Sequence, residues 1–181
     1  MAFLIILLIL IVILGTLGII YTVNYNKMQY LKTKIEQAEG LIDETLRERY
    51  DLLVRANDII KNTLNDEKDY LKEYINLKNK NITNFEMDRL LRKAFIVLNK
   101  YKDDYKELQS NKELKDICTS IKESNEKLTA TTSFFNKNTN LLNGYIRKFP
   151  SNIVAKINKF TIKPFFDGKN MNDEIYNDFK L

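Results

Sequence analysis

Hydrophobic residues follow three successive patterns along the 181-residue chain, and the first is an uninterrupted apolar run. The 21 residues from Phe3 to Val23 carry no charge and are dominated by Ile and Leu. A helix of this length spans roughly 31 Å, which is about the thickness of the hydrocarbon layer of a bilayer. A cleaved signal peptide is the alternative, but the basic start and the small-residue cleavage site that it needs are missing. We predict an uncleaved membrane anchor over residues 1–23.

The later patterns are apolar stripes at helical spacing. From Leu31 to about Leu77 a broad apolar face is expected on one long helix that continues out of the membrane. Its members are Ile35, Ala38, Ile42, Leu46, Leu53, Ala56, Ile60, Leu64, Leu71 and Tyr74. Two narrower stripes follow, with steps of three and four residues. They are Met87, Leu91, Ala94, Leu98, Tyr101, Tyr105, Leu108, and then Leu114, Ile117, Ile121, Ser124, Leu128, Thr131, Phe135, Asn138, Leu142, Tyr145, Phe149.

Two helix starts are marked by polar residues. Thr83 stands three residues before Glu86, and Ser110 stands three before Glu113, which is the spacing of a capping box. Each pair follows or lies within a polar, asparagine-rich run, at 78–81 and 109–112. We therefore expect helices to begin at these two places.

The spacing of the breaks predicts the fold. Proline is absent between Asn24 and Phe149, so the frequent turns of a sheet are not encoded. Short connections between long helices favour antiparallel neighbours. We predict an all-α protein with the anchor at 1–23, an antiparallel bundle of three long helices at 24–149, and a short helical or irregular segment at 150–181. A continuous trimeric coiled coil is the alternative, but it would not need the polar interruptions.

The composition narrows the chemistry. The chain has no His, no Trp, one Cys and five Gly, among 29 basic and 24 acidic residues. This excludes His-based acid–base catalysis, His-ligated metals, disulfide frameworks and glycine-rich phosphate loops. Cys118 follows Ile117 on an apolar stripe with no His to activate it, which predicts a small buried hydrophobe. We expect no enzyme activity, no cofactor and no metal site.

Five polar residues lie near the apolar stripes. Asn136 and Asn143 are seven residues apart and share one side of a helix, where their amides can satisfy each other and fix the register. Ligand binding by this pair is the alternative. Asp43, Arg49 and Asp51 are expected to complete a buried polar network with them.

The C-terminal part is basic and aromatic. Six basic residues and one acidic residue lie between Arg147 and Lys169, interleaved with Phe149, Phe160, Phe165 and Phe166. The favoured interpretation is that the phenylalanines pack on the bundle while the lysines stay in water. Contact with anionic lipid is the alternative, at about 1 kcal/mol per basic residue near the surface. No recognition motif supports nucleic-acid binding.

Short motifs along most of the chain form a recognisable set. The first half reads Tyr25-Asn26-x-Met28, then Ala38, Asp43, Leu46, Arg49, Asp51, Leu52 and the acidic Glu67. The second half reads Tyr105-x-x-Leu108, Phe135-Asn136, Asn143, Ile146, Phe149-Pro150-x-Asn152, Phe160 and Pro164-Phe165-Phe166. This set resembles the LemA family of bacterial membrane-anchored proteins. The resemblance implies an N-terminal anchor followed by a helical domain, and it implies no established reaction.

The chain departs from the family pattern at four positions. Val54 stands where the family usually has a proline, and Lys106 replaces another proline after Tyr105. Asn125 and Thr132 stand where the family tends to have a Glu and an Arg. The residues Asn125 and Thr132 remove an ion pair that the family's Glu and Arg would allow on the third helix.

These observations favour a structural role. We expect a non-enzymatic helical scaffold or interaction module of the bacterial cell envelope, anchored in the bilayer through residues 3–23, whose partner is an unidentified protein or a second copy. A sensory or signal-relay role through the polar positions Ser124, Thr131 and Asn138 is the alternative. Lysines directly after the anchor favour a cytoplasmic bundle under the positive-inside rule, with an extracellular or periplasmic bundle as the alternative.

Overall fold

The computed structural model of the chain is built from α-helices. It describes residues 1–65, 70–76 and 82–167. Six helices lie in these ranges, and no strand does: α1 (Ala2–Leu64), α2 (Lys72–Ile75), α3 (Asn84–Asp104), α4 (Lys106–Ser110), α5 (Lys112–Arg147) and α6 (Ser151–Ile157). The predicted all-α class is confirmed.

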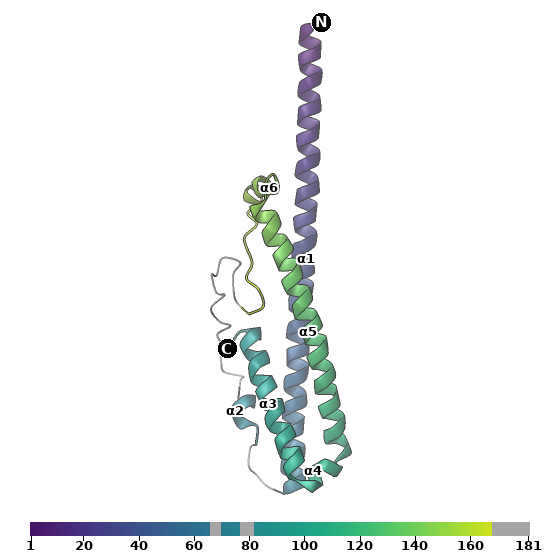
Figure 1. The fold of residues 1–181 in the computed structure, drawn as a ribbon, viewed down its shortest axis with the longest axis vertical. Helices are drawn as coiled ribbons and strands as arrows, with labels where there is room; N and C mark the ends of the chain where they lie inside the picture. The colour runs from purple at the N-terminus through teal and green to yellow at the C-terminus, as the bar shows by residue number, and fades with distance from the viewer. Residues whose placement is uncertain (66–69, 77–81, 168–181) are drawn as a thin grey trace, which may run out of the picture. The chain divides into compact units, whose positions relative to one another are not determined.

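α1 is one helix of 63 residues that includes the apolar run (Figure 1). Among the described residues it is the one helix long and apolar enough to cross a membrane, by length and composition, and none of its apolar window is buried. From Met28 onward one face is buried, through Leu31, Ile35 and further apolar residues to Ile60. The prediction that the helix continues out of the apolar run is confirmed.

The end of α1 differs from the prediction. α1 stops at Leu64, not near Leu77. Asn65 follows with φ 52°, the left-handed conformation that asparagine tolerates and that commonly closes a helix. Leu71 is buried and Tyr74 is half-buried, but they lie beyond α1.

The chain groups into two compact units. Unit 1 contains residues 1–37 and 135–181, and unit 2 contains residues 38–134. Each unit therefore combines part of α1 with part of α5.

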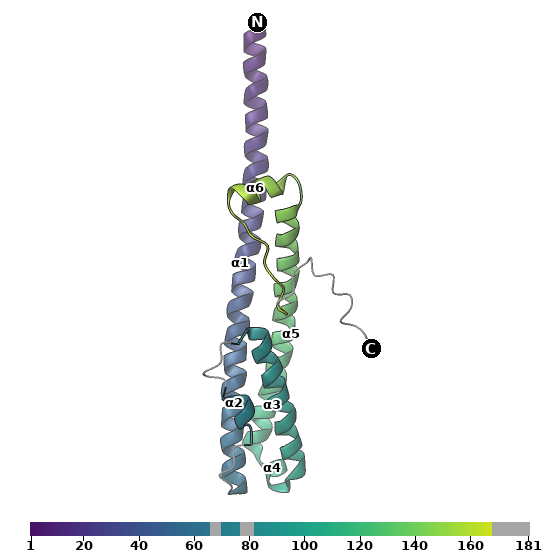
Figure 2. The same ribbon diagram turned by 90° about the vertical axis from the view of Figure 1, so that its left-hand side faces the viewer.

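Unit 2 contains the second part of α1, α3 and the first part of α5, side by side (Figures 1 and 2). Asp88, near the start of α3, is bonded to Arg49. Asn111, directly before α5, is bonded to Thr63 near the end of α1. α3 therefore runs in the same direction as α1, and α5 runs opposite to both. The predicted antiparallel arrangement is wrong for α1 and α3.

The path of the chain after α1 explains the parallel pair. The backbone N–H of the fully buried Leu71 donates to Asn57 Oδ1 at 3.2 Å, so the chain has turned back along α1. α2 follows directly, and α3 then starts far from the end of α1. The predicted connection, the polar run 78–81, lies outside the described residues. The segment between the end of α1 at Leu64 and the start of α3 at Asn84 is long, so it does not force the two helices to be antiparallel as a short turn does.

The two predicted helix starts have different outcomes. At Thr83 the capping box is confirmed: Thr83 Oγ1 accepts from the N–H of Glu86, and Glu86 Oε2 accepts from the N–H of Thr83. At the second start, Asn111 takes the place predicted for Ser110, because Asn111 Oδ1 accepts from the N–H of Leu114 at 3.0 Å. The cap lies one residue later than predicted.

The two narrow stripes are mostly buried. Leu91, Ala94, Leu98 and Leu108 are buried on the first, although Tyr105 interrupts the helix and is exposed. The second stripe is buried at most positions, namely Leu114, Ile117, Ile121, Ser124, Leu128, Phe135, Asn138 and Leu142. Phe149 lies beyond α5 and is 73% exposed, so its assignment to this stripe is wrong.

Candidate functional site

Arg49 is a fully buried charge in unit 2. Its Nη1 donates to Asp88 Oδ1 at 2.7 Å, and its Nε and Nη2 donate to Oγ and the main-chain O of Ser124 at 3.1 and 3.2 Å. Asp88 also accepts from Arg92 Nε at 2.9 Å. Burial lowers the pKa of the Arg49 guanidinium, while the hydrogen bond and charge of Asp88 raise it. One protonated guanidinium therefore joins α1, α3 and α5.

The structure gives Arg49 other partners than those predicted. Asp43 is bonded to Arg47 on the same helix at 2.9 Å, and Asp51 is exposed. The sequence does indicate that Asp88 is a buried acidic residue, because it stands three residues before Leu91 and shares the apolar side of α3. The sequence also indicates a polar contact at Ser124, because it is a polar residue within an apolar stripe.

Asn136 and Asn143 bind the C-terminal tail, which we define as residues 158–167. Asn143 Nδ2 donates to the main-chain O of Lys163 at 2.7 Å, and Asn143 Oδ1 accepts from the N–H of Lys163 at 2.9 Å. Asn136 Oδ1 accepts from the N–H of Phe166 at 2.8 Å. The predicted mutual pairing of the two amides is replaced by pairing with main chain.

The spacing of the two asparagines fits the tail. Seven residues of α-helix advance about 10.5 Å, and three residues of extended chain advance about 10 Å. Asn143 and Asn136 can therefore meet Lys163 and Phe166 in turn, with the tail running opposite to α5. Pro164 lies between these attachments and has no N–H that needs a partner.

α6 lies beside α1 where the apolar run ends (Figures 1 and 2). Asn158, the C-cap of α6, donates through Nδ2 to the hydroxyl of Tyr21 at 3.0 Å, and the hydroxyl lies 3.2 Å from Asn158 Oδ1. Tyr25 stacks on Tyr21 and meets the ring of Phe160 edge-on. Aromatic contacts and the Asn158 amide thus attach the segment after α6 to α1.

The side chains of α6 and its flanks divide into two sets. Ser151, Val154 and Ala155 are buried. The exposed set combines apolar with basic residues: Phe149, Ile153 and Ile157 are 73%, 52% and 63% exposed, and Lys148, Lys156 and Lys159 are exposed beside them. Phe160, Phe165 and Phe166 are half-buried, whereas Pro164 and Asn152 are exposed. Phe149 therefore departs from the expectation that the phenylalanines pack on the helices.

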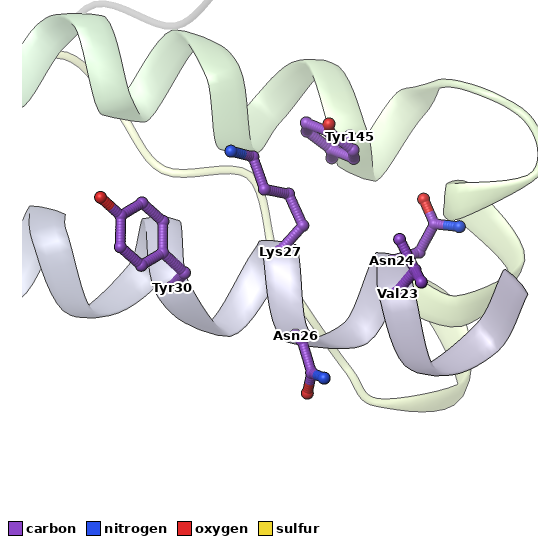
Figure 3. Close-up of a pocket in the computed structure, with 6 residues that line it drawn as sticks. All are labelled: Val23, Asn24, Asn26, Lys27, Tyr30 and Tyr145. Atoms are coloured by element: carbon purple, nitrogen blue, oxygen red, sulfur yellow. The ribbon is translucent and has the colours of Figure 1, made fainter. Parts of the chain in front are cut away.

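The described part of unit 1 includes an open groove and a smaller cavity. An open groove of about 570 Å³ is lined by residues of α1 and by Tyr145 of α5. Figure 3 shows Lys27 and Asn24 on the side of α1 that faces Tyr145, whereas Asn26 points away. A smaller cavity of about 130 Å³ near the turn after α6 is lined by three lysines, Lys32, Lys159 and Lys163, among other residues.

The two units differ in charge. Unit 2 has 18 basic and 19 acidic residues and is nearly neutral. The described part of unit 1, residues 1–37 and 135–167, has nine basic and two acidic residues, and the two acids are Glu36 and Asp167. The basic excess of the protein therefore lies in unit 1.

Other candidate chemistry is sparse in the described ranges. Cys118 is buried, as predicted for a small hydrophobe, and this burial raises the pKa of its thiol. Groups of three or more His, Cys, Asp or Glu side chains able to hold a metal do not occur in the part of the chain that the structure describes.

Comparison with known proteins identifies the family. The model of the LemA family matches residues 38–177, which is most of the chain. The chain belongs to the LemA family. No similar curated protein and no similar solved structure was found.

Several LemA motif residues have defined contacts. Arg49, Asn136 and Asn143 make the bonds described above, and Glu67 lies outside the described residues. Tyr105 has φ −120° and ψ 119°, the conformation that a following proline would favour, so the break between α3 and α4 is present although Lys106 replaces the proline.

The other departures from the LemA pattern also have a place in the structure. α1 continues as helix through Val54. On α5, the hydroxyl of Thr132 donates to the main-chain O of Leu128, and within the described residues the buried Oδ1 of Asn125 has no hydrogen-bond partner.

Proposed function

We propose that this LemA protein is a single-pass, membrane-anchored helical scaffold of the bacterial cell envelope without enzymatic activity. The observation that carries the proposal is that α1 joins an exposed apolar run to packed residues from Met28 onward within one helix. A bilayer would cover the apolar run, and the helix would present the packed part next to the membrane.

The proposed scaffold needs a surface for a partner. Ile96 of α3 is 69% exposed although it lies on a helix of the unit 2 core, so we propose it as the position at which contact with a second copy or another protein is probed. Lys93, also exposed on α3, provides a matched polar position.

Two measurements test this proposal. The full chain should stay in the membrane fraction through alkaline carbonate extraction, and a chain without residues 2–23 should be released. A photo-crosslinking residue at Ile96 should give a discrete adduct in whole cells, which mass spectrometry identifies as a second copy or another protein, whereas the same residue at Lys93 should give none. Release of the full chain, or identical adducts at both positions, contradicts the scaffold.

We propose that the helical part faces the cytoplasm. Lys27, Lys32 and Lys34 follow the apolar run closely enough to count under the positive-inside rule, whereas Met1 and Ala2 carry no charged side chain. A C-terminal reporter that is active only outside the cytoplasm should then be inactive, while a fluorescent reporter that folds in the cytoplasm should be bright. The reverse pattern would place the helical part outside.

The signal-relay role stays an alternative prediction. It invokes Ser124, which accepts from Arg49 and is held at the junction of three helices. A relay requires a second arrangement of such an element. Altered adducts at Ile96 in an otherwise folded Ser124→Ala variant would favour the relay.

A further inference from the structure

We infer that α6 and its flanking residues dock on anionic phospholipid at the surface of the bilayer that holds α1. We call the exposed residues Lys148, Phe149, Ile153, Lys156, Ile157 and Lys159 the docking face. The inference rests on the proposed membrane anchoring and adds a specific lipid contact to it.

Position along α1 is the first argument. Tyr21 lies 18 residues after Phe3, which is about 27 Å of helix, so it reaches the boundary of a hydrocarbon layer that begins near Phe3. Asn158 is hydrogen-bonded to Tyr21. This bond places the C-terminal end of α6 at the level of the headgroups, where tyrosine rings are also favoured.

The mixture of side chains is the second argument. Three large apolar residues of the docking face are more than half exposed, and all three lie within nine positions of the chain. In water this exposure is unfavourable, whereas the boundary between headgroups and acyl chains covers apolar side chains and leaves lysine ammonium groups among phosphates. The face has the composition of an interfacial element.

Charge selects the lipid. The stretch that carries the docking face, residues 148–159, contains three basic residues and no acidic one, so its net charge favours a lipid phosphate. The three lysines of the docking face, Lys148, Lys156 and Lys159, are exposed. Each basic residue near an anionic surface favours the docked state about fivefold. An anionic bilayer therefore binds this face more strongly than a zwitterionic one.

Lys159 adds an independent observation. Its φ is 56°, and the turn is closed by a hydrogen bond from the N–H of Phe160 to the O of Ala155 at 2.9 Å. This helix-ending position favours glycine, and a lysine there is strained. The strain is accounted for if the ammonium group of Lys159 is needed where the turn meets the lipid.

The absence of tryptophan from the chain provides the test. Full-length Ile13→Trp, Phe149→Trp and Thr33→Trp proteins are reconstituted into vesicles of phosphatidylcholine alone or with about one third phosphatidylglycerol, each with brominated acyl chains that quench tryptophan. Ile13 reports the anchor. Thr33 is exposed on α1, about 18 Å beyond Tyr21, and serves as the control outside the headgroup layer.

The expected result is strong quenching at position 13 in both lipids, quenching at position 149 that is several-fold stronger with phosphatidylglycerol, and none at position 33. Replacing Lys148, Lys156 and Lys159 together by Gln should remove the lipid dependence at position 149 and leave position 13 unchanged. If position 13 is quenched but position 149 is not, or position 149 is equally quenched in both lipids, docking on anionic lipid is overturned while anchoring stands. If position 13 is not quenched, anchoring fails and the docking inference falls with it.

Discussion

The Arg49 centre predicts an asymmetric response to the removal of its two charges. Asp88→Ala leaves the fully buried Arg49 with hydrogen bonds to Ser124 but with no carboxylate. Removing one member of a buried ion pair costs about 3–5 kcal/mol, because the remaining charge is uncompensated. Arg49→Met leaves Asp88 paired with Arg92 at 2.9 Å, and the side chain of Arg92 is 45% exposed to water. This second change should cost about 1–2 kcal/mol, mainly the lost hydrogen bonds.

Urea unfolding of the full chain in detergent micelles, followed by far-UV circular dichroism, measures both changes. Asp43→Ala is the matched control, since Asp43 is bonded to Arg47 in a pair whose side chains are 46% and 74% exposed. Such a surface pair contributes about 0–1 kcal/mol. The order of stability loss should be Asp88→Ala, then Arg49→Met, then Asp43→Ala. Equal losses at Asp88 and Asp43, or a larger loss for Arg49→Met than for Asp88→Ala, would refute the reasoning.

Four further predictions follow from individual contacts. Lys159→Gly should raise the free energy of unfolding by about 1 kcal/mol, since it relieves the left-handed conformation at φ 56°; a lower value in urea unfolding would contradict this. Asn143→Ala removes two hydrogen bonds to Lys163 and should speed chymotryptic cleavage after Phe165, two residues further along the tail, whereas Asn140→Ala, at an exposed position of α5, should not. Hydrogen bonds from the N–H and side chain of Thr83 lower the pKa of Glu86. The ionised carboxylate of Glu86 therefore stabilises the fold fully above its ordinary pKa of 4.5, and this contribution is lost as the pH falls through the lowered pKa. The difference in unfolding free energy between wild type and Glu86→Gln should narrow below about pH 4.5. Cys118 is buried with a raised thiol pKa, so a disulfide reagent should label it slowly in the native protein and rapidly in urea, and equal rates would show that it is accessible.

Apolar periodicity predicts helices and buried faces because it reflects local geometry. Leu91 and Leu98 are buried because steps of three and four residues keep them on one side of α3. α1 is continuous because no proline interrupts it and because its three glycines, Gly15, Gly18 and Gly40, are isolated residues that a long helix tolerates. These features depend on neighbours within a few residues, which the sequence displays directly.

Helix direction and polar partners depend on distant residues. The polar run at 78–81 has the composition of a short connection between helices, but the chain already turns at Asn65. The returning chain is attached to α1 by a hydrogen bond from the backbone N–H of Leu71 to the side chain of Asn57. Arg49 meets Ser124 across 75 positions of the chain. No periodic pattern identifies such a partner. Asn136 and Asn143 stand out in the sequence as polar residues beside an apolar stripe, but their partners are main-chain atoms, which every residue possesses.

The attachment of the tail bears on how α6 can act. Asn143 and Asn136 fix Lys163 and Phe166 to α5, and α5 itself ends at Arg147. The 15 residues between Arg147 and Lys163, which include α6, are therefore held at both ends, and the bond between Asn158 and Tyr21 holds them at a third point. Ordering a segment is a large part of the free-energy cost of binding, and here folding has already ordered it. Basic residues attract an anionic surface only within about 8 Å at physiological salt, so the three attachments matter because they keep lysines at the level of Tyr21. The same lysines on a free tail would spend most of their time beyond that range.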